Sequence, residues 1–466
     1  MEQPPFEYAD QDAASDSPAP EPDRLLLAPF RATRYTNAVD LSAVVSPPYD
    51  LVSDDDLARL RDAEPHNAVR LILPEATPEG PHPTPAPSLP APPPPDDPQT
   101  GRYRRAAQAM ADWFADGVLH TDDDPALYVY EHAEPGPDGA FLPVQRGLIG
   151  GIGLSRSETG VVLPHENVLP GPVEDRLRLM TATQANLEPI FLLYDGGGTA
   201  SAMVDDTAAS GPPLCEAWTS AHTRHRLWPI TDRAELDAIA ADLAHRQALI
   251  ADGHHRYATY LRLRDHHHAA GHGAGPWDYG LTLLVDSLAY PPKLGAIHRV
   301  LPDLPPERAV RALRTAFTVD EARGDLTELL DRLTEADEDG PAYLVAGDGR
   351  YWLVTAPDPD SVSAAMPTQR SARWRALNTS VLHVFVIPKL WGIEEDESTV
   401  RIVHHDAAEA VRRAAATGGT AVILPPLRVP DVTAVAADGE KVPRKSTSFG
   451  PKPPTGLVMR AFAAQV

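Results

Sequence analysis

One stretch of the sequence, QALIADGHHR at 247–256, constrains the fold more than any other. The apolar run before Asp252 is typical of a buried strand. The residues that follow, YATYLRLRD, are typical of a helix, and Asp252 suits the N-cap of that helix. Gly253 has no Cβ, so a ligand can approach the backbone closely at this point. The sequence therefore predicts a strand, a tight turn and a helix in direct succession.

The first turn of this predicted helix carries His254, His255 and Arg256. Exposed N–H groups, the positive end of a helix dipole and a guanidinium together form a phosphate site. A surface turn that happens to carry polar residues is the alternative interpretation. We expect the stretch from Asp252 to Arg256 to hold the phosphates of a nucleotide.

The composition excludes several classes of protein. A net charge of −25, from 41 Lys+Arg and 66 Asp+Glu, argues against non-specific binding of nucleic acid, which needs a basic surface. With one cysteine, Cys215, neither an internal disulfide nor a cysteine-based zinc cluster can form. The N-terminus is acidic, and no stretch approaches the roughly 18 apolar residues of a membrane helix. We expect a cytoplasmic protein that contacts neither nucleic acid nor membrane.

Strand-like and helix-like segments are interleaved along the chain, which favours a mixed α/β (α+β) fold. The length of 466 residues is enough for two or three domains. We expect a disordered tail at 1–22, an N-terminal α/β domain at 23–304 and a C-terminal α/β region at 305–466. Residues 75–100 are rich in proline and are expected to form an extended, disordered insert in the first domain.

Some segments have clear local signatures. DDDLARLRD predicts a short helix capped by Ser53, and VRLILP from Val69 predicts a strand. ALYVYEH and FLPVQRGLIGGIGL predict a pair of strands, and GDGR at 347–350 predicts a hairpin turn. The GGIG within the second strand lacks the strand–helix setting of a dinucleotide fingerprint. The run of histidines at 266–268 is expected to be solvated at a helix end.

A second group of polar residues follows an apolar run at His165 and Glu166, before a predicted helix that carries Glu174 and Arg176. A carboxylate in a loop beside a histidine can act as a base toward a hydroxyl. Glu166 is a candidate base, with a purely structural role equally open, whereas Glu174 suits the dipole of the helix. We regard His165 and Arg176 as candidate substrate-binding residues.

Two further loops carry chemistry. The prolines of SPPYD make a rigid loop, and Asp50 at its end would bind a metal, a substrate amine or nothing. RKSTSFGPKPPTGLV near the C-terminus offers Arg444, Lys445 and Lys452, which is suited to phosphate in an otherwise acidic chain. A surface tail is the alternative interpretation of the second segment.

VVSPPYD, LPHE, EDRLRLMTATQANLEPIFLLY, HRLWPI, ADGHHRYAT, IHRVL and KSTSFGPKPPTGLV occur in this order. Together they closely resemble a bacterial and archaeal family known as domain of unknown function 1015, from about Arg24 to Phe462. The chain departs from that pattern in its acidic N-terminal tail and its proline-rich insert, which we expect to be peripheral to any shared activity.

A shorter resemblance concerns the DGHHR string. With its preceding strand and following helix it is similar to the phosphate-binding motif of the ParB/sulfiredoxin superfamily, and the free-serine kinases of that superfamily carry the same string. The resemblance implies a ParB/sulfiredoxin-like core and a phosphotransferase. Such an enzyme would phosphorylate free L-serine, or a similar hydroxyl compound, with ATP or ADP and Mg²⁺.

A kinase of this kind needs phosphate cradling, charge neutralisation and a base at the acceptor. By the resemblance, His254, His255 and Arg256 would hold the phosphates, and Asp252 would cap the helix or help to place Mg²⁺. Glu166 would be the base, with Asp50 as the second candidate. We expect no metal site built from protein ligands alone. Lys445 and Lys452 are expected to close over the phosphates from the C-terminal region. The nucleotide-binding residues that the resemblance implies are therefore Asp252, Gly253, His254, His255, Arg256, Lys445 and Lys452.

Two other functions remain open at this point. One is a ParB-like regulatory protein that binds a nucleotide without kinase activity, and the other is a non-catalytic scaffold that presents the proline-rich loop to a partner. The sequence does not define the phosphoryl donor, the acceptor, the pathway or the oligomeric state.

Overall fold

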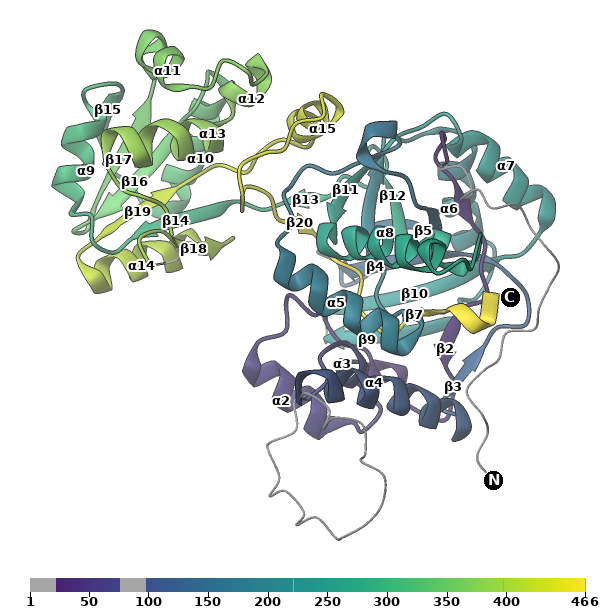
Figure 1. Ribbon diagram of the computed structural model, residues 1–466. Coiled ribbons are helices and arrows are strands. Elements are labelled where there is room, and N and C mark those ends of the chain that lie inside the picture. Colours follow the sequence, from purple (N-terminus) through teal and green to yellow (C-terminus); the bar gives the residue numbers. More distant parts are fainter. Residues whose placement is uncertain (1–21, 76–97, 221, 397, 466) are drawn as a thin grey trace, which may run out of the picture.

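The computed structural model describes residues 22–75 and 98–465, apart from residues 221 and 397. The chain forms two lobes, a larger one on a nine-stranded sheet and a smaller one on a six-stranded sheet (Figure 1). The mixed α/β fold is confirmed. Residues 1–21 of the expected tail and 76–97 of the expected insert lie outside the described residues, and the expectation that the insert extends to residue 100 is wrong because a helix begins at Pro98.

The larger sheet has the order β6-β11-β8-β12-β5-β4-β10-β9, and β1 pairs with β5. It is mixed, because β11 runs parallel to β6 and antiparallel to β8, while β12 runs parallel to β8. Its strands are β1 (Leu27–Ala28), β4 (Leu127–Pro135), β5 (Phe141–Gly153), β6 (Val162–Leu163), β8 (Ile190–Tyr194), β9 (Cys215–Ser220), β10 (Thr223–Ile230), β11 (Ala248–Asp252) and β12 (Tyr279–Asp286). The predicted strand pair at β4 and β5 is confirmed.

Helices cover this sheet because their apolar side chains match its buried faces. Tyr257 and Leu263 of one helix join Ile190 and Ile250 of the sheet in a single hydrophobic core. The helices of this lobe are α1 (Leu41–Val44), α2 (Asp54–Ala63), α3 (Val69–Ile72), α4 (Pro98–Ala115), α5 (Pro170–Thr183), α6 (Gly198–Ala209), α7 (Arg233–Leu243), α8 (His254–Ala269) and the 3-10 turns Ser157–Thr159 and Pro276–Asp278. Ser53 caps α2, as predicted.

The smaller lobe has the sheet order β15-β17-β16-β19-β14-β18. The strands are β14 (Ile297–Leu301), β15 (Thr318–Ala322), β16 (Tyr343–Gly347), β17 (Arg350–Thr355), β18 (Arg401–His404) and β19 (Thr420–Ile423). The helices are α9 (Pro306–Leu313), α10 (Leu326–Glu338), α11 (Pro359–Ala365), α12 (Ala372–Ala376), α13 (Asn378–Val381), a π-helix at Leu382–Leu390, α14 (Ala407–Thr417) and α15 (Val429–Ala437). The predicted hairpin turn at 347–350 joins β16 to β17.

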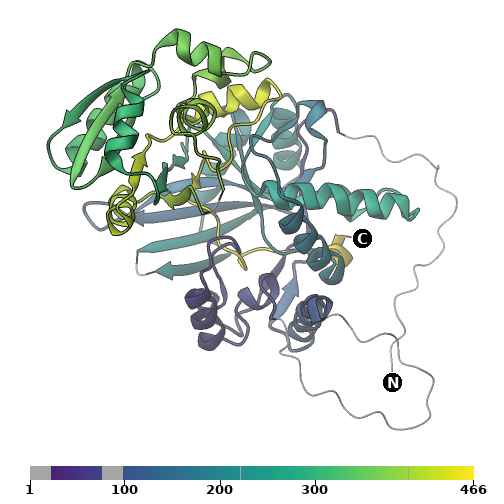
Figure 2. The same cartoon turned by 60° about the vertical axis from the view of Figure 1, so that its left-hand side comes forward.

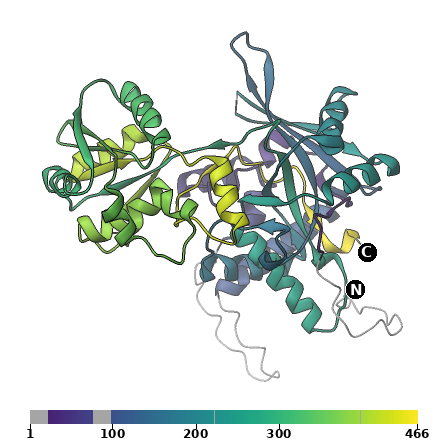
Figure 3. The same cartoon turned by 90° about the horizontal axis from the view of Figure 1, so that it is seen from above.

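The C-terminal segment, yellow in Figures 2 and 3, leaves the smaller lobe and returns to the larger one. Its short strand β20 (Phe449–Gly450) pairs with β13 (Lys293–Leu294), and its short strand β21 (Arg460–Ala461) pairs with β7 (Ala185–Asn186). Elsewhere in the larger lobe, the short strands β2 (Thr33–Tyr35) and β3 (Leu119–Thr121) pair with each other. The expected domain boundary between residues 304 and 305 does not separate the strands of the two sheets, because β14 lies before this boundary and belongs to the smaller sheet. The chain ends in a 3-10 turn at Phe462–Gln465.

Two expectations about local structure are wrong. VRLILP contains the short helix α3 instead of a strand, because a brief apolar run does not distinguish a buried helix from a buried strand. The histidines at 266–268 are not all solvated: His267 stacks on Trp277 with ring centroids 4.1 Å apart, and His268 lies 2.8 Å from the carboxylate of Asp278. Among the described residues, no helix has the length and apolar character needed to cross a membrane.

Candidate functional site

The turn between β11 and α8 has the geometry of an anion site. Gly253 occupies the N-cap position with φ of 94°, in the left-handed region. A Cβ at this position would lie 2.7 Å from Cγ2 of Ile190, so both conformation and space require glycine. No described side chain caps the helix. The N–H groups of its first turn therefore keep their capacity to bind an anion.

The prediction that Asp252 caps α8 is wrong. The pairing of β11 with β8 is irregular between Ile250 and Asp252, and an irregularity of this kind redirects the side chain at the strand end. The carboxylate of Asp252 accepts a hydrogen bond from Nη2 of Arg256 at 2.7 Å and lies 2.5 Å from Nζ of Lys452. Asp252 therefore connects the helix to the C-terminal segment.

Arg256 is buried, with 3% of its surface exposed. Besides its bond to Asp252, its Nη1 donates to the carbonyl of Pro189 at 2.8 Å. Burial lowers the pKa of Arg256, but the charges of Glu188, Asp252 and Asp50 outweigh that effect and raise it. The guanidinium thus points inward and holds the turn in place, and a direct contact with phosphate stays a prediction.

Lys452 bridges two of the predicted site residues. Its Nζ lies 2.6 Å from Oδ2 of Asp50 and 2.5 Å from Oδ1 of Asp252. Burial lowers the pKa of Lys452, but the two carboxylates outweigh it and raise the pKa. Burial would raise the pKa of Asp50, yet Lys452 and Arg256 lower it. The SPPYD loop, the β11–α8 turn and the C-terminal segment therefore meet at one cation.

Glu166 has the opposite electrostatic environment from Asp50. Burial raises the pKa of Glu166, and the charge of Asp252 adds to this, although the N–H of Lys445 donates to its Oε1 at 3.3 Å. A carboxyl with a raised pKa is a better proton acceptor near neutral pH than one with a lowered pKa. On these grounds Glu166 suits a general base better than Asp50.

His165 and His254 form a buried pair beside the turn. Their rings are 4.5 Å apart and nearly perpendicular, and the N–H of His165 donates to Nε2 of His254 at 3.3 Å. Burial lowers the pKa of His165 to about 3 and lowers that of His254 well below the ordinary range. Nε2 of His165 lies 2.9 Å from Oγ1 of Thr447. Both imidazoles are therefore neutral at pH 7.

His255 and Lys445 lie on the outer side of the turn. The Nε2 atom of His255 accepts the N–H of Leu169 at 3.0 Å, which ties α8 to the loop that follows Glu166. Burial lowers the pKa of His255, as does the charge of Lys445. The Lys445 side chain is exposed, and its carbonyl accepts a hydrogen bond from Nη2 of Arg299 at 2.8 Å. Arg299 belongs to β14, so the smaller lobe fixes this part of the site.

Arg176 is buried and bound to its own neighbours. Its Nε donates to Asp175 at 2.8 Å and its Nη1 to the carbonyl of Ile72 at 2.7 Å. Its guanidinium lies over the ring of Tyr49, 4.4 Å from the centroid, and Arg256 approaches the same ring at 5.9 Å. Tyr49 and Arg176 line a cavity of about 600 Å³ whose other charged residues are Arg61, Glu75, Arg102 and Asp175.

Glu188 is a site residue that the sequence analysis did not single out. It is buried, and its Oε1 accepts hydrogen bonds from the N–H of Tyr49 and from Oγ1 of Thr455, each at 3.0 Å. Its charge also raises the pKa of Arg256. The sequence signal for Glu188 is a carboxylate directly before the apolar run PIFLLY, which is typical of a buried strand. Since charged residues are rarely buried without a partner, a carboxylate at such a position indicates a specific contact.

The predicted residues therefore form one connected group in the larger lobe. Ion pairs link Asp50, Asp252, Arg256 and Lys452. Glu166 accepts a hydrogen bond from the backbone of Lys445, and His254 accepts one from the backbone of His165. Arg176 joins the group only through Tyr49. In the described part of the chain, no group of three or more His, Cys, Asp or Glu side chains is arranged to hold a metal ion.

Comparison with solved structures gives distant likenesses. A free serine kinase in complex with AMP is 13% identical, with 66% of this chain and 90% of that chain covered and a TM-score of 0.34. A conserved hypothetical protein from Pyrococcus furiosus is 13% identical, with 64% and 92% covered and a TM-score of 0.32. SbnI with a C-terminal truncation, from Staphylococcus aureus, is 11% identical, with 68% and 89% covered and a TM-score of 0.34. Values at this level say nothing about activity.

Family membership rests on a separate finding. No curated protein matches the chain. The family described as protein of unknown function (DUF1015) matches residues 27–380, which is most of the chain. The resemblance expected from the ordered sequence motifs is confirmed over these residues, while its expected extension to Phe462, with the motif KSTSFGPKPPTGLV, lies outside the match. The chain belongs to the DUF1015 family.

Proposed function

We propose that the chain binds a nucleotide at the β11–α8 turn and transfers a phosphoryl group to the hydroxyl of a small compound of the L-serine class. The proposal rests on the start of α8, which has no side-chain cap and follows Gly253 in a positive-φ conformation. Beside it, Lys452 lies between the carboxylates of Asp50 and Asp252. Helix starts of this kind bind phosphate through backbone N–H groups and the helix dipole.

The neutral histidines fit this proposal. Because His165 and His254 stay uncharged, the phosphates would be held by N–H donors and by Lys452 and Lys445. Lys452 and Arg256 together balance the charges of Asp50 and Asp252, which would otherwise repel a phosphate. The exposed Lys445 adds a further positive charge beside the helix start.

Glu166 is proposed as the base that accepts the hydroxyl proton. The hydroxyl oxygen would attack the terminal phosphorus of the nucleotide, the bond to the bridging oxygen would break, and the proton would pass to Glu166. The raised pKa of Glu166 supports this role over Asp50, whose lowered pKa and ion pair with Lys452 favour the permanently charged form.

The acceptor is proposed to enter the cavity beside Tyr49 and Arg176. This cavity presents both guanidinium and carboxylate groups, which match the two charges of a free amino acid. His165 does not line it, so the proposed substrate role passes to Arg176 and Tyr49.

Mg²⁺ usually binds through one or two carboxylates together with substrate phosphates. Asp252 and Asp50 are the carboxylates that would hold it, and the ion would supply charge neutralisation for the phosphates. Both carboxylates contact Lys452, so they do not form a site for the ion without the nucleotide.

The test is to incubate the full chain with ATP or ADP and an amino-acid pool and to identify phosphorylated products by mass spectrometry. The wild type and Glu174→Gln should form the same product, whereas Glu166→Gln should not. Glu174 is a matched control because its side chain is half-exposed and its ion pairs in the described part of the chain are with arginines of α5 and α8. Nucleotide binding without any product would favour the regulatory alternative, and absence of nucleotide binding would refute the proposal.

A further inference from the structure

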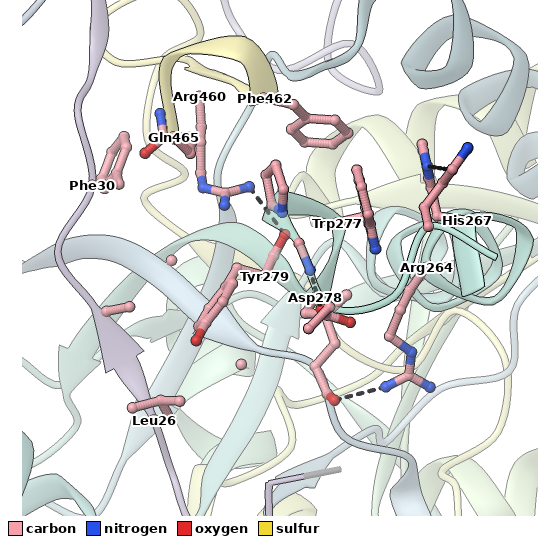
Figure 4. Close-up of a pocket in the computed structure, with 18 of the residues that line it drawn as sticks. Leu26, Phe30, Arg264, His267, Trp277, Asp278, Tyr279, Arg460, Phe462 and Gln465 are labelled. Carbon is pink, nitrogen blue, oxygen red and sulfur yellow. Dashed lines mark hydrogen bonds between the residues drawn. The ribbon is translucent and has the colours of Figure 1, made fainter. Parts of the chain in front are cut away.

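A large cavity in the described part of the chain lies away from the site described above. It has a volume of about 1120 Å³ and is lined at the far end of α8 by Arg264 and His267 (Figure 4). Helices rise about 1.5 Å per residue, so these side chains lie roughly 15–20 Å along the axis from the helix start. A cavity of this size accommodates a small organic ligand. It is therefore a second, separate candidate site.

The walls of this cavity are mainly apolar. Phe30, Trp277 and Phe462 line it from three different parts of the chain, together with Leu26. Gly151 and Gly153 of the GGIG stretch in β5 also line it, and a Cβ at Gly153 would lie 3.3 Å from the side chain of Leu26. Such walls favour an aliphatic or aromatic body.

One charged side chain at the cavity has no counter-ion among the residues that the structure describes. Arg460 is only 3% exposed, and its Nη1 donates to Oδ1 of Asn186 at 3.3 Å and to the carbonyl of Tyr279 at 3.2 Å. Its Nε has no hydrogen-bond partner, and no ion pair joins Arg460 to a carboxylate among the described residues. Burial lowers the pKa of Arg460 to about 10, so it remains charged at neutral pH.

The nearby carboxylate does not neutralise it. Asp278 also lines the cavity, but one of its oxygens lies 2.8 Å from Nε2 of His268 and the other accepts the N–H of Gly275 at 2.7 Å. A buried cation without an anion is costly, and a ligand that brings an anion would relieve that cost.

We infer that this cavity binds a small monoanion with an apolar body, such as the carboxylate of a fatty or aromatic acid. The carboxylate would meet the guanidinium of Arg460, whose flanking rings are those of Tyr279 and Phe462 at 5.8 and 5.7 Å. The apolar body would lie against Phe30 and Trp277. The other buried arginine of the cavity, Arg264, is paired with Asp265 at 3.2 Å. One cation without a described counter-ion matches one negative charge better than the two charges of a phosphate.

The experiment uses the full chain and the fluorescent probe anilinonaphthalene sulfonate, which carries an aromatic body and one negative charge. Dodecanoate should displace the bound probe at a concentration at least tenfold lower than dodecanol, which has the same chain without the charge. Equal displacement by the two, or no probe binding by the folded wild type, would overturn the inference.

Two pairs of variants locate the site. Arg460→Met should weaken dodecanoate binding at least tenfold, and Arg460→Lys should retain most of it. Ala463→Trp fills the cavity from an exposed position and should abolish binding, whereas Ala437→Trp, exposed on α15, should not. If Arg460→Met does not fold, the comparison of Ala463→Trp with Ala437→Trp shows whether the ligand binds in this cavity. Unchanged binding in Ala463→Trp would overturn the assignment.

Discussion

Nζ of Lys452 lies 2.5 Å from Oδ1 of Asp252, which joins the C-terminal segment to the turn between β11 and α8. The same Nζ atom reaches the SPPYD loop, so three segments far apart in the sequence are held by one cation. This arrangement leaves the helix start uncapped while it holds the ammonium group of Lys452 beside it. The proposed phosphate site depends on that combination.

Replacing Arg256 should affect stability first. Arg256→Met removes a buried guanidinium that is paired with Asp252 and bonded to the carbonyl of Pro189. Breaking a buried ion pair typically costs about 3–5 kcal/mol. Chemical denaturation should show a loss of this size, and the exposed Arg262→Met on the same helix should lose less than about 1 kcal/mol. A fully stable Arg256→Met protein would show that the inward pairing is unimportant.

Glu166→Gln should lower turnover by about 10²–10⁴-fold with little change in nucleotide affinity. Since the base must be deprotonated, the rate of the wild type should rise with pH. Because the pKa of Glu166 is raised, this rise should be centred above the ordinary value for glutamate, about 4.3. Near-full turnover in Glu166→Gln would move the base to Asp50, and Asp50→Asn would then be the next variant.

Stability should decrease in mild acid because buried histidines are neutral in the folded protein. Burial lowers the pKa of His225 to about 3, so between that value and about 6.5 the unfolded chain binds a proton that the folded chain does not. The free energy of unfolding should therefore fall as the pH decreases from 6.5. Each such histidine lowers the free energy of unfolding by about 1.4 kcal/mol for every pH unit of acidification below 6.5.

Denaturant titrations at several pH values test this with His225→Gln. The variant should show a shallower dependence on pH than the wild type by roughly that amount per unit between pH 6 and 5. His266→Gln, at an exposed position of α8, serves as the control. An unchanged slope in His225→Gln would contradict a neutral, buried His225.

Local patterns in the sequence predicted much of the fold. The β11–turn–α8 succession follows from an apolar run, a glycine and a helical stretch, and Ser53 was identifiable as a cap. The helical nature of Val69–Ile72 was not, because four apolar residues fit either structure.

Contacts between distant segments could not be predicted from local patterns. Nothing near Asp252 in the sequence indicates that its carboxylate forms an ion pair with Lys452. The sequence around Arg256 likewise does not indicate that its guanidinium pairs with Asp252, which makes it less available for a phosphate. The partners of Glu188 come from the N-terminal and C-terminal segments, so its role depends on the tertiary fold.

The most direct test of the central claim is calorimetric titration of ATP and ADP, with Mg²⁺, into the full chain. The wild type should bind, and Lys452→Met should bind about ten- to a hundredfold more weakly, because one charge-assisted contact of about 1.5–3 kcal/mol is lost, Asp50 loses its ion pair and Asp252 keeps only its pair with Arg256. Lys293→Met, an exposed lysine that lies 3.6 Å from Glu134, should bind as the wild type does. No binding by the wild type, or equal affinity in all three proteins, would contradict a nucleotide site at the start of α8.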